Sequence, residues 1–277
     1  MASLSCVALC RGLEKTYVPW HAAEQGRTLL SMRGFKSRSQ IDKLGERLVK
    51  EGPLEQSDLR ELQRLRSAYD EPMGEVRMIV TEKLGLQATS RLKTVNTIIE
   101  KLKRERTRLS TIQDIAGLRL VKDMNLTEQD EISRIIAEIF LGAKLVDRRE
   151  QPSHGYRAVH VIVPSGECPV EIQVRTALQD LWAQAMEKVA DAIGREIRYG
   201  VPPANDAHRS TVEMLMKMSG MIANLEQLIV QVSESETAAD RTTSHSTEYQ
   251  SQKTRLAVIR SEVRQLLEEL KVPGVQK

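Results

Sequence analysis

The sequence predicts an α+β fold, in which a mixed or antiparallel central sheet is flanked by helices and followed by a helical C-terminal extension. Segments 155–163 and 170–176 alternate apolar and polar residues as half-buried strands do. Segments before and after them repeat apolar residues at helical spacing. The resulting order of helices, strand, helix, strands and helix favours a sheet with helices packed against it.

Composition is that of a soluble globular protein without a membrane span. The 277 residues are 40% hydrophobic and 29% charged, and no apolar run reaches the ~20 residues that cross a bilayer. The net charge is only +3, but basic residues crowd the segment 91–108, which indicates a local anion site. Three cysteines, an odd number, support neither a disulfide framework nor a four-ligand zinc site, so we expect a cytoplasmic protein.

Helices are expected before the sheet, after a poorly determined lead-in at residues 1–35. Two helical stripes lie on either side of Gly52-Pro53, and they comprise Ile41, Leu44 and Leu48, then Leu59, Leu62 and Leu65. A further helix is expected to start near Ser90. Its buried side would carry Val95, Ile98, Ile99 and Leu102, and its other side would be basic.

The next elements alternate between strand and helix. Residues 112–121, which include Asp114, form a candidate strand. Residues 127–140 are expected to form a helix with a capping-box-like start from Thr127 to Asp130, and Gly142 is a plausible stop. A strand-like segment follows at 143–149. After the two alternating strands, a helix is expected from Thr176 to about Gly194, with Trp182 in the core.

Segments 155–163 and 170–176 are expected to form a hairpin that closes near Gly166. Its apolar faces would then align, and so would its polar faces, which carry His160, Glu171, Gln173 and Arg175. An amphipathic pair with one solvated face is the competing interpretation. The choice of His, Glu, Gln and Arg over Lys, Ser and Thr favours a catalytic face.

Pro202-Pro203 marks a boundary before a helical C-terminal extension. Apolar spacing predicts one long helix from Val212 to Val232 and another from Leu256 to Leu270, with a polar, flexible joint at 233–246. Such a helical hairpin could be a packing appendage, or it could bind an antitoxin or a second copy of the chain.

Four strings occur in an order that resembles the synthetase domain of the RelA/SpoT family. They are Arg91-x-Lys93, the QDIAGLR string that holds Asp114 and Arg119, GYRAVH at 155–160 and EIQVRT at 171–176. The resemblance implies a nucleotidyltransferase-like synthetase domain at 36–200, with the extension at 204–277. It also implies transfer of the β,γ-pyrophosphate of ATP to the ribose 3′-hydroxyl of GDP or GTP, which makes (p)ppGpp and releases AMP.

Pyrophosphoryl transfer needs cations around a polyanion and a divalent metal that bridges its oxygens. We assign Asp114 and Glu171 as catalytic residues and as ligands of Mg²⁺, and Gln173 as a third catalytic residue. By the resemblance, Glu171 also takes the proton of the 3′-hydroxyl. The predicted ATP-binding residues are Arg91, Lys93, Lys101, Arg104 and Arg119. A solvated helix face and structural ion pairs are the alternatives.

The acceptor site follows from the same resemblance, in which Tyr156 stacks on the acceptor base. The other predicted acceptor-binding residues are His160, Arg148, Arg149 and Arg175. The family's usual lysines before the Gly-Tyr pair are missing from 147–154, where Arg148 and Arg149 could replace their charge. A toxin that modifies the 3′ end of tRNA therefore stays open as a second interpretation, and a catalytically silent nucleotide sensor as a third.

Overall fold

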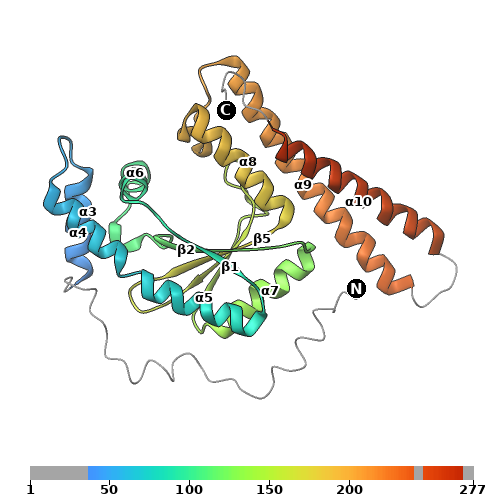
Figure 1. Cartoon of the computed structure of the whole chain (residues 1–277), viewed down its shortest axis with the longest axis horizontal. Helices are drawn as coiled ribbons and strands as arrows, with labels where there is room; N and C mark the ends of the chain where they lie inside the picture. Colours follow the sequence, from blue (N-terminus) through green and yellow to red (C-terminus); the bar gives the residue numbers. More distant parts are fainter. Residues whose placement is uncertain (1–36, 240–245, 271–277) are drawn as a thin grey trace. The chain divides into compact units, whose positions relative to one another are not determined.

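A computed structural model describes residues 37–239 and 246–270, so the predicted lead-in at 1–35 lies outside the described residues. The described chain has an α+β fold, as predicted. Its strands form a five-stranded sheet in the order β1-β2-β5-β4-β3 (Figure 1). The strands are β1 (Ala88–Leu92), β2 (Ala116–Lys122), β3 (Lys144–Asp147), β4 (Val159–Val163) and β5 (Val170–Thr176).

Two pairs of neighbouring strands, β1 with β2 and β4 with β5, are antiparallel. β1 and β2 are antiparallel, with Arg91 opposite Gly117 and Thr89 opposite Arg119. The backbone N–H of Lys93 donates to the Ile115 carbonyl oxygen at 2.9 Å, which extends this ladder beyond the strand ends. β4 and β5 are neighbours joined only by residues 164–169. A parallel crossover needs a dozen residues or more, so these two strands form the predicted antiparallel hairpin.

The described residues fall into two compact units that both take residues from the sheet. The first unit contains the described residues up to Leu120, together with Ile132–Val146 and His160–Gln173. The second contains Val121–Glu131, Asp147–Val159 and the described residues from Val174 onward.

The first unit holds most of the sheet and the N-terminal helices. These are α3 (Arg38–Val49), α4 (Gln56–Ser67), α5 (Asp70–Leu84), α6 (Val95–Glu105) and most of α7 (Leu126–Ile139), with a 3₁₀ turn η2 at Leu109–Thr111. α5 and α7 lie on one side of the sheet and α6 on the other (Figure 1). The apolar side of the sheet packs with buried residues of these helices, including Val76, Val80, Ile132 and Ile136.

The helix that was expected to start near Ser90 was placed too early, because Ala88–Leu92 is strand β1. β1 is an edge strand whose exposed middle residues give it little apolar alternation, so the sequence pattern hid it. The helix begins at Val95, where the Thr94 side chain caps it by accepting from the Thr97 N–H at 3.3 Å. Arg91 and Lys93 therefore do not belong to the same helix as Lys101 and Arg104.

The capping box predicted at Thr127–Asp130 was also wrong, by two residues. Asn125 and Glu128 form it instead: the Glu128 N–H donates to Asn125 Oδ1 at 2.9 Å, and the Asn125 N–H donates to Glu128 Oε2 at 3.0 Å. Glu reaches back to the cap more readily than the shorter Asp, so the helix starts two residues earlier. The helix after β5 begins where it was predicted, and a capping box of Thr176 with Gln179 starts it.

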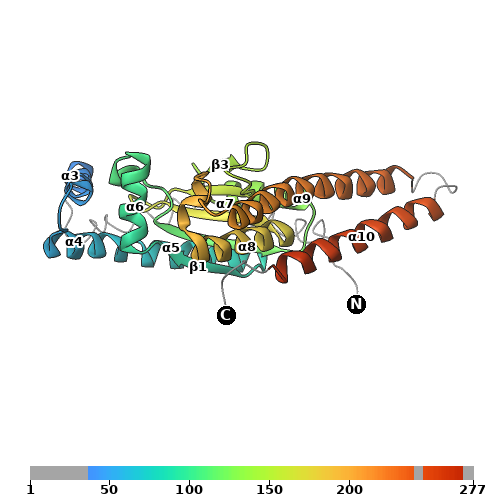
Figure 2. The ribbon, with the colours of Figure 1, turned by 90° about the horizontal axis from the view of Figure 1, so that it is seen from above.

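The second unit is built around three helices, α8 (Ala177–Ile193), α9 (Asp206–Ala239) and α10 (Ser246–Glu268), with a 3₁₀ segment η3 at Arg195–Tyr199. α9 and α10 run antiparallel and side by side in both views (Figures 1 and 2). Trp182 lies in their common apolar core, as predicted, and its Nε1 donates to the Leu215 carbonyl oxygen at 2.7 Å. α9 extends into the predicted joint at 233–246 as far as Ala239. None of the described helices combines the length and apolarity needed to cross a membrane.

Candidate functional site

Strand alternation gathers polar side chains on one face of β1, β2 and β5. Because directly opposed residues point to the same face, Arg91 shares a face with Gly117, and Thr89 shares it with Arg119. Gly117 also adjoins β5, since a Cβ atom on it would lie 3.6 Å from the Arg91 carbonyl oxygen and 3.8 Å from the Glu171 carbonyl oxygen. Because Gly117 has no side chain, no side chain covers the sheet backbone between Arg91 and Glu171 at this position.

Asp114 lies in the segment before β2, where two lysines neutralise it. Lys101 Nζ of helix α6 lies 3.0 Å from both carboxylate oxygens of Asp114. Lys93 Nζ lies 3.2 Å from Asp114 Oδ2. All three side chains are about one-fifth exposed, so the pairs are screened less than surface ion pairs are.

Glu171 is buried on β5 and hydrogen-bonded at both carboxylate oxygens. His160 Nδ1 of β4 lies 2.9 Å from Oε1, and Gln173 Nε2 donates to Oε2 at 2.7 Å. Burial by itself would raise the pKa of this carboxyl, but the bonds from His160 and Gln173 and the charge of Lys93 outweigh it and lower the pKa to about 2. Glu171 is therefore a carboxylate at any physiological pH.

Lys93 connects the two predicted catalytic carboxylates. Its ammonium group forms the ion pair with Asp114 and also lowers the pKa of Glu171 through its charge. The structure therefore gathers six predicted site residues in the first unit: Lys93, Lys101, Asp114, His160, Glu171 and Gln173. His160, which the resemblance assigns to the acceptor site, lies beside the carboxylate of Glu171.

The strands of the hairpin are buried on both faces, so a solvated polar face is excluded. Only 9% of His160, 8% of Glu171 and 2% of Arg175 is exposed. Buried charged groups are costly unless they are paired, and each of these three has a charged or polar partner. Such a cluster is typical of a functional site.

The remaining predicted ATP-binding arginines lie at the margins of this cluster. Arg91 is exposed on the edge strand β1, and Arg119 is partly buried on β2. Arg104 is exposed near the end of α6, and its Nη2 lies 3.0 Å from Glu105 Oε1. Among the residues that the structure describes, no three or more His, Cys, Asp or Glu side chains are grouped as a ready-made metal site.

The other predicted acceptor residues belong to the second unit, where Arg175 and Tyr156 form a pair. Arg175 Nη2 donates to the Tyr156 hydroxyl at 3.1 Å, and the guanidinium carbon lies 5.0 Å from the centre of the Tyr156 ring. Arg175 Nη1 donates to Asp180 Oδ1 at 2.8 Å. Tyr156 is half-buried against the core of the α8–α9 pair, so only part of its ring remains for another contact.

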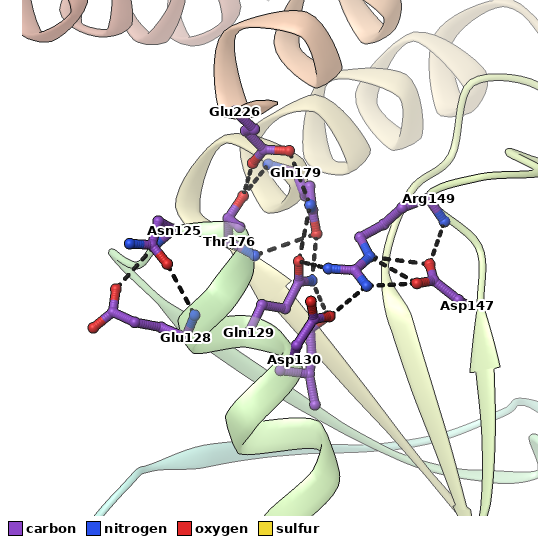
Figure 3. A network of polar contacts seen from close by, with 10 residues as sticks. Asn125, Glu128, Gln129, Asp130, Asp147, Arg149, Thr176, Gln179 and Glu226 are labelled. Atoms are coloured by element: carbon purple, nitrogen blue, oxygen red, sulfur yellow. Dashed lines mark hydrogen bonds and ion pairs between the residues drawn. The ribbon is translucent and has the colours of Figure 1, made fainter. Parts of the chain in front are cut away.

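Arg149 is engaged inside the protein, as Figure 3 shows. Its guanidinium donates to Asp147, to Asp130 and to Gln129 Oε1, the last at 3.1 Å. Burial would raise the pKa of Asp147, but the hydrogen bonds and charge of Arg149 outweigh it and lower that pKa. Arg148 has an exposed side chain. Of the two arginines predicted to replace the family's lysines, only Arg148 presents its side chain to solvent.

Sequence reasoning missed two buried polar residues of α9 that lie near the predicted acceptor residues of the second unit. Glu226 of α9 accepts from the Thr176 hydroxyl and from Gln179 Nε2, which lies 3.0 Å away (Figure 3). Ser219 of α9 contacts the loop that carries Tyr156. Both interrupt the apolar stripe of a predicted helix, and that interruption is the signal that could have found them.

The segment that carries most of the predicted site residues matches a known protein family. Residues 90–193 match the family described as the region found in RelA / SpoT proteins. Residues 90–193 form a RelA/SpoT domain. The four strings that carried the resemblance all lie in this segment.

Two relatives extend the comparison. The uncharacterized protein Rv1366 of Mycobacterium tuberculosis is 45% identical over 143 residues, which cover 50% of this chain and 51% of that protein. The chain thus aligns with about half the length of this relative. GTP pyrophosphokinase YwaC of Bacillus subtilis is 29% identical over 134 residues, covering 39% of this chain and 59% of that protein.

Among solved structures, the small alarmone synthetase 1 of Bacillus subtilis is similar, with a TM-score of 0.49 and 20% sequence identity. The match covers 65% of this chain and 99% of that protein.

Proposed function

We propose that this chain is an ATP-dependent pyrophosphokinase, which transfers the β,γ-pyrophosphate of ATP to the 3′-hydroxyl of GDP or GTP and releases AMP. The observation that carries the proposal is the polar cluster in which Lys93 and Lys101 pair with Asp114, beside buried Glu171 held by His160 and Gln173. That cluster lies inside the RelA/SpoT domain. A relative of this domain is named GTP pyrophosphokinase.

The two carboxylates suit a Mg²⁺ ion that arrives with ATP. Magnesium is commonly held by one or two carboxylates, with waters and substrate phosphate oxygens as its other ligands. Asp114 and Glu171 would hold it together with oxygens of the substrate. The bound ion would neutralise charge on the transferred group.

Lys93 and Lys101 are the cations best placed to bind the ATP phosphates. Both ammonium groups now pair with Asp114, and lysine on a flexible stem can exchange a carboxylate partner for a phosphate oxygen. Arg91 and Arg119 share a face of the sheet, where guanidinium groups suit bidentate phosphate contacts and stacking on a base. Their side chains form the outer part of the proposed ATP site.

Glu171 acts as a metal ligand and as a hydrogen-bond acceptor that orients the attacking hydroxyl. With a pKa of about 2 it is a weak base, whereas efficient general bases have pKa values near the working pH. Positioning and charge neutralisation account for most of the catalysis in phosphoryl transfer. Gln173 supports this role because it fixes one oxygen of Glu171 at 2.7 Å.

On the acceptor side, the Tyr156 ring would stack on the base and exposed Arg148 would meet a phosphate. Arg175 holds the Tyr156 hydroxyl, so its role is to support the ring. A guanine nucleotide and the 3′ end of tRNA both offer a base and a 3′-hydroxyl, and the test below distinguishes them.

The test incubates purified chain, Mg²⁺ and [γ-³²P]ATP with GDP, GTP or bulk tRNA. Label on GDP or GTP, with AMP as co-product, supports the proposal. Label on tRNA would show that tRNA is the acceptor in place of the guanine nucleotide. ATP binding without transfer would indicate a nucleotide sensor. Glu171→Gln should abolish transfer, whereas Glu167→Gln, an exposed change in the turn of the same hairpin, should leave it intact.

A further inference from the structure

Polar side chains occupy two core positions of helix α9. Leu215, Ser219, Ile222 and Glu226 recur at helical spacing, and each is at most 5% exposed. A polar group in such a position destabilises the fold unless it is hydrogen-bonded. The partners of Ser219 and Glu226 therefore show what α9 holds in place.

Ser219 contacts both neighbours of Tyr156. Its hydroxyl donates to the Gly155 carbonyl oxygen at 2.5 Å and accepts from Arg157 Nε at 3.2 Å. Ser219 is 3% exposed, so water does not compete readily for these bonds. One hydroxyl thus bonds the backbone immediately before the tyrosine and the Arg157 side chain immediately after it.

The turn around Tyr156 is also held by contacts within the second unit, among them the bond from Arg157 Nη1 to the Arg149 carbonyl oxygen and the bond from Arg175 to the Tyr156 hydroxyl. Its backbone N–H donates to the Ser153 carbonyl oxygen at 3.0 Å. Gly155 has φ of +83°, a conformation that favours glycine. A Cβ atom there would lie 2.7 Å from the Trp182 ring. The turn is therefore pressed against α8, and Ser219 supplies its side-chain hydrogen bonds from α9.

Glu226 lies two turns further along α9, where it accepts from Thr176 and Gln179 at the start of α8 (Figure 3). A buried polar contact of this kind specifies the register between helices. Thr176 directly follows Arg175, which bonds the Tyr156 hydroxyl. The two polar groups of α9 thus set the helix against both segments that hold the tyrosine.

We propose that Ser219 is a positioning residue of the acceptor site, which fixes the turn from Gly155 to Arg157 so that the Tyr156 ring faces the acceptor base. The effect of Ser219 on acceptor binding rests on the function proposed above. Its stabilisation of the turn does not depend on that function, so the two claims are tested by separate measurements. Helix α9 of the C-terminal extension thereby helps to position the acceptor site.

The first measurement compares hydrogen–deuterium exchange in the wild type, Ser219→Ala and Ser233→Ala. Ser233 is a matched control, because it lies on the same helix and its hydroxyl bonds the Ile229 carbonyl of that helix, at 2.8 Å. Ser219→Ala loses both hydrogen bonds of the hydroxyl, so exchange at 153–158 should be at least about five- to tenfold faster, which is the effect expected from one such bond alone. Unchanged exchange at 153–158, or an equal increase throughout α8, would overturn the proposal.

The second measurement is the KM of each substrate in the transfer reaction. Ser219→Ala should raise the KM of the acceptor about five- to tenfold, with the KM of ATP and kcat nearly unchanged. Equal increases for both substrates, or no change despite faster exchange at 153–158, would overturn the acceptor role. If the wild type transfers to no acceptor, the proposed function fails, and the exchange data still decide whether Ser219 holds the turn.

Discussion

Lys93 Nζ lies 3.2 Å from Asp114 Oδ2, and the same ammonium group lowers the pKa of Glu171. One lysine therefore offsets the charge of two carboxylates that belong to different segments of the chain. Under the proposed function, Lys93 would bind a phosphate oxygen and the two carboxylates would hold Mg²⁺.

Lys93→Met should abolish transfer and weaken ATP binding, since it removes a phosphate-binding cation and leaves two carboxylates in partial repulsion. Lys103→Met is the matched control, because Lys103 is an exposed lysine on the neighbouring helix α6. Isothermal titration with a non-hydrolysable ATP analogue checks the prediction. ATP binding of Lys93→Met equal to that of the wild type would contradict the assignment.

Glu171 should contribute to stability only above acidic pH. Its pKa is lowered from the ordinary glutamate value of 4.5 to about 2 in the folded chain. A lowered pKa gives stability that is fully present above the unfolded value and is lost as pH falls toward the folded value. Between pH 4.5 and 2, the free energy of unfolding should therefore fall less in Glu171→Gln than in the wild type. Urea melts across this range measure it, and parallel slopes would refute the low pKa.

Gly155→Ala should destabilise the chain more than Gly166→Ala. Both glycines have positive φ, +83° and +54°, so both substitutions carry backbone strain of about 1 kcal/mol. Only at Gly155 would the new Cβ also meet the Trp182 ring, at 2.7 Å, whereas nothing lies within 4 Å at Gly166. We expect a loss of about 2–4 kcal/mol for Gly155→Ala. Denaturant unfolding measures both, and equal losses would show that the loop does not pack on Trp182.

Arg149→Met and Arg148→Met should separate a structural role from a binding role. Arg149→Met leaves Asp130, Asp147 and Gln129 without their common donor, so it should cost about 1–3 kcal/mol of stability. Arg148 has an exposed side chain, so its replacement should leave the melting temperature unchanged and raise the KM of a phosphate-bearing acceptor. The reverse pattern, with Arg148→Met the less stable variant, would contradict this division.

The sequence predicted the hairpin of β4 and β5 well, because alternation and a turn around Gly166 are local signals. Strand β1 was not predicted. Only Ala88 of this edge strand is buried, so its apolar alternation is too weak to detect. The helix start at Asn125 was missed because two capping patterns overlap in the sequence, and only the longer Glu side chain closes the box.

The candidate site was predictable in its residue types but not in its pairing. Strings of the sequence pointed to Asp114 and Glu171, yet periodicity does not say that Lys93 pairs with Asp114. It also places His160 on the same face as Glu171 without specifying their direct contact at 2.9 Å. Tertiary packing decides that the polar face is buried, and that information is absent from a local pattern.

The most direct test of the central claim is the stoichiometry of products when [γ-³²P]ATP, Mg²⁺ and GDP are incubated with the chain and, in parallel, with Asp114→Asn. The account predicts AMP and labelled acceptor in equal amounts with the wild type, and neither product with the variant. Formation of ADP in place of AMP, or undiminished transfer by Asp114→Asn, would contradict it.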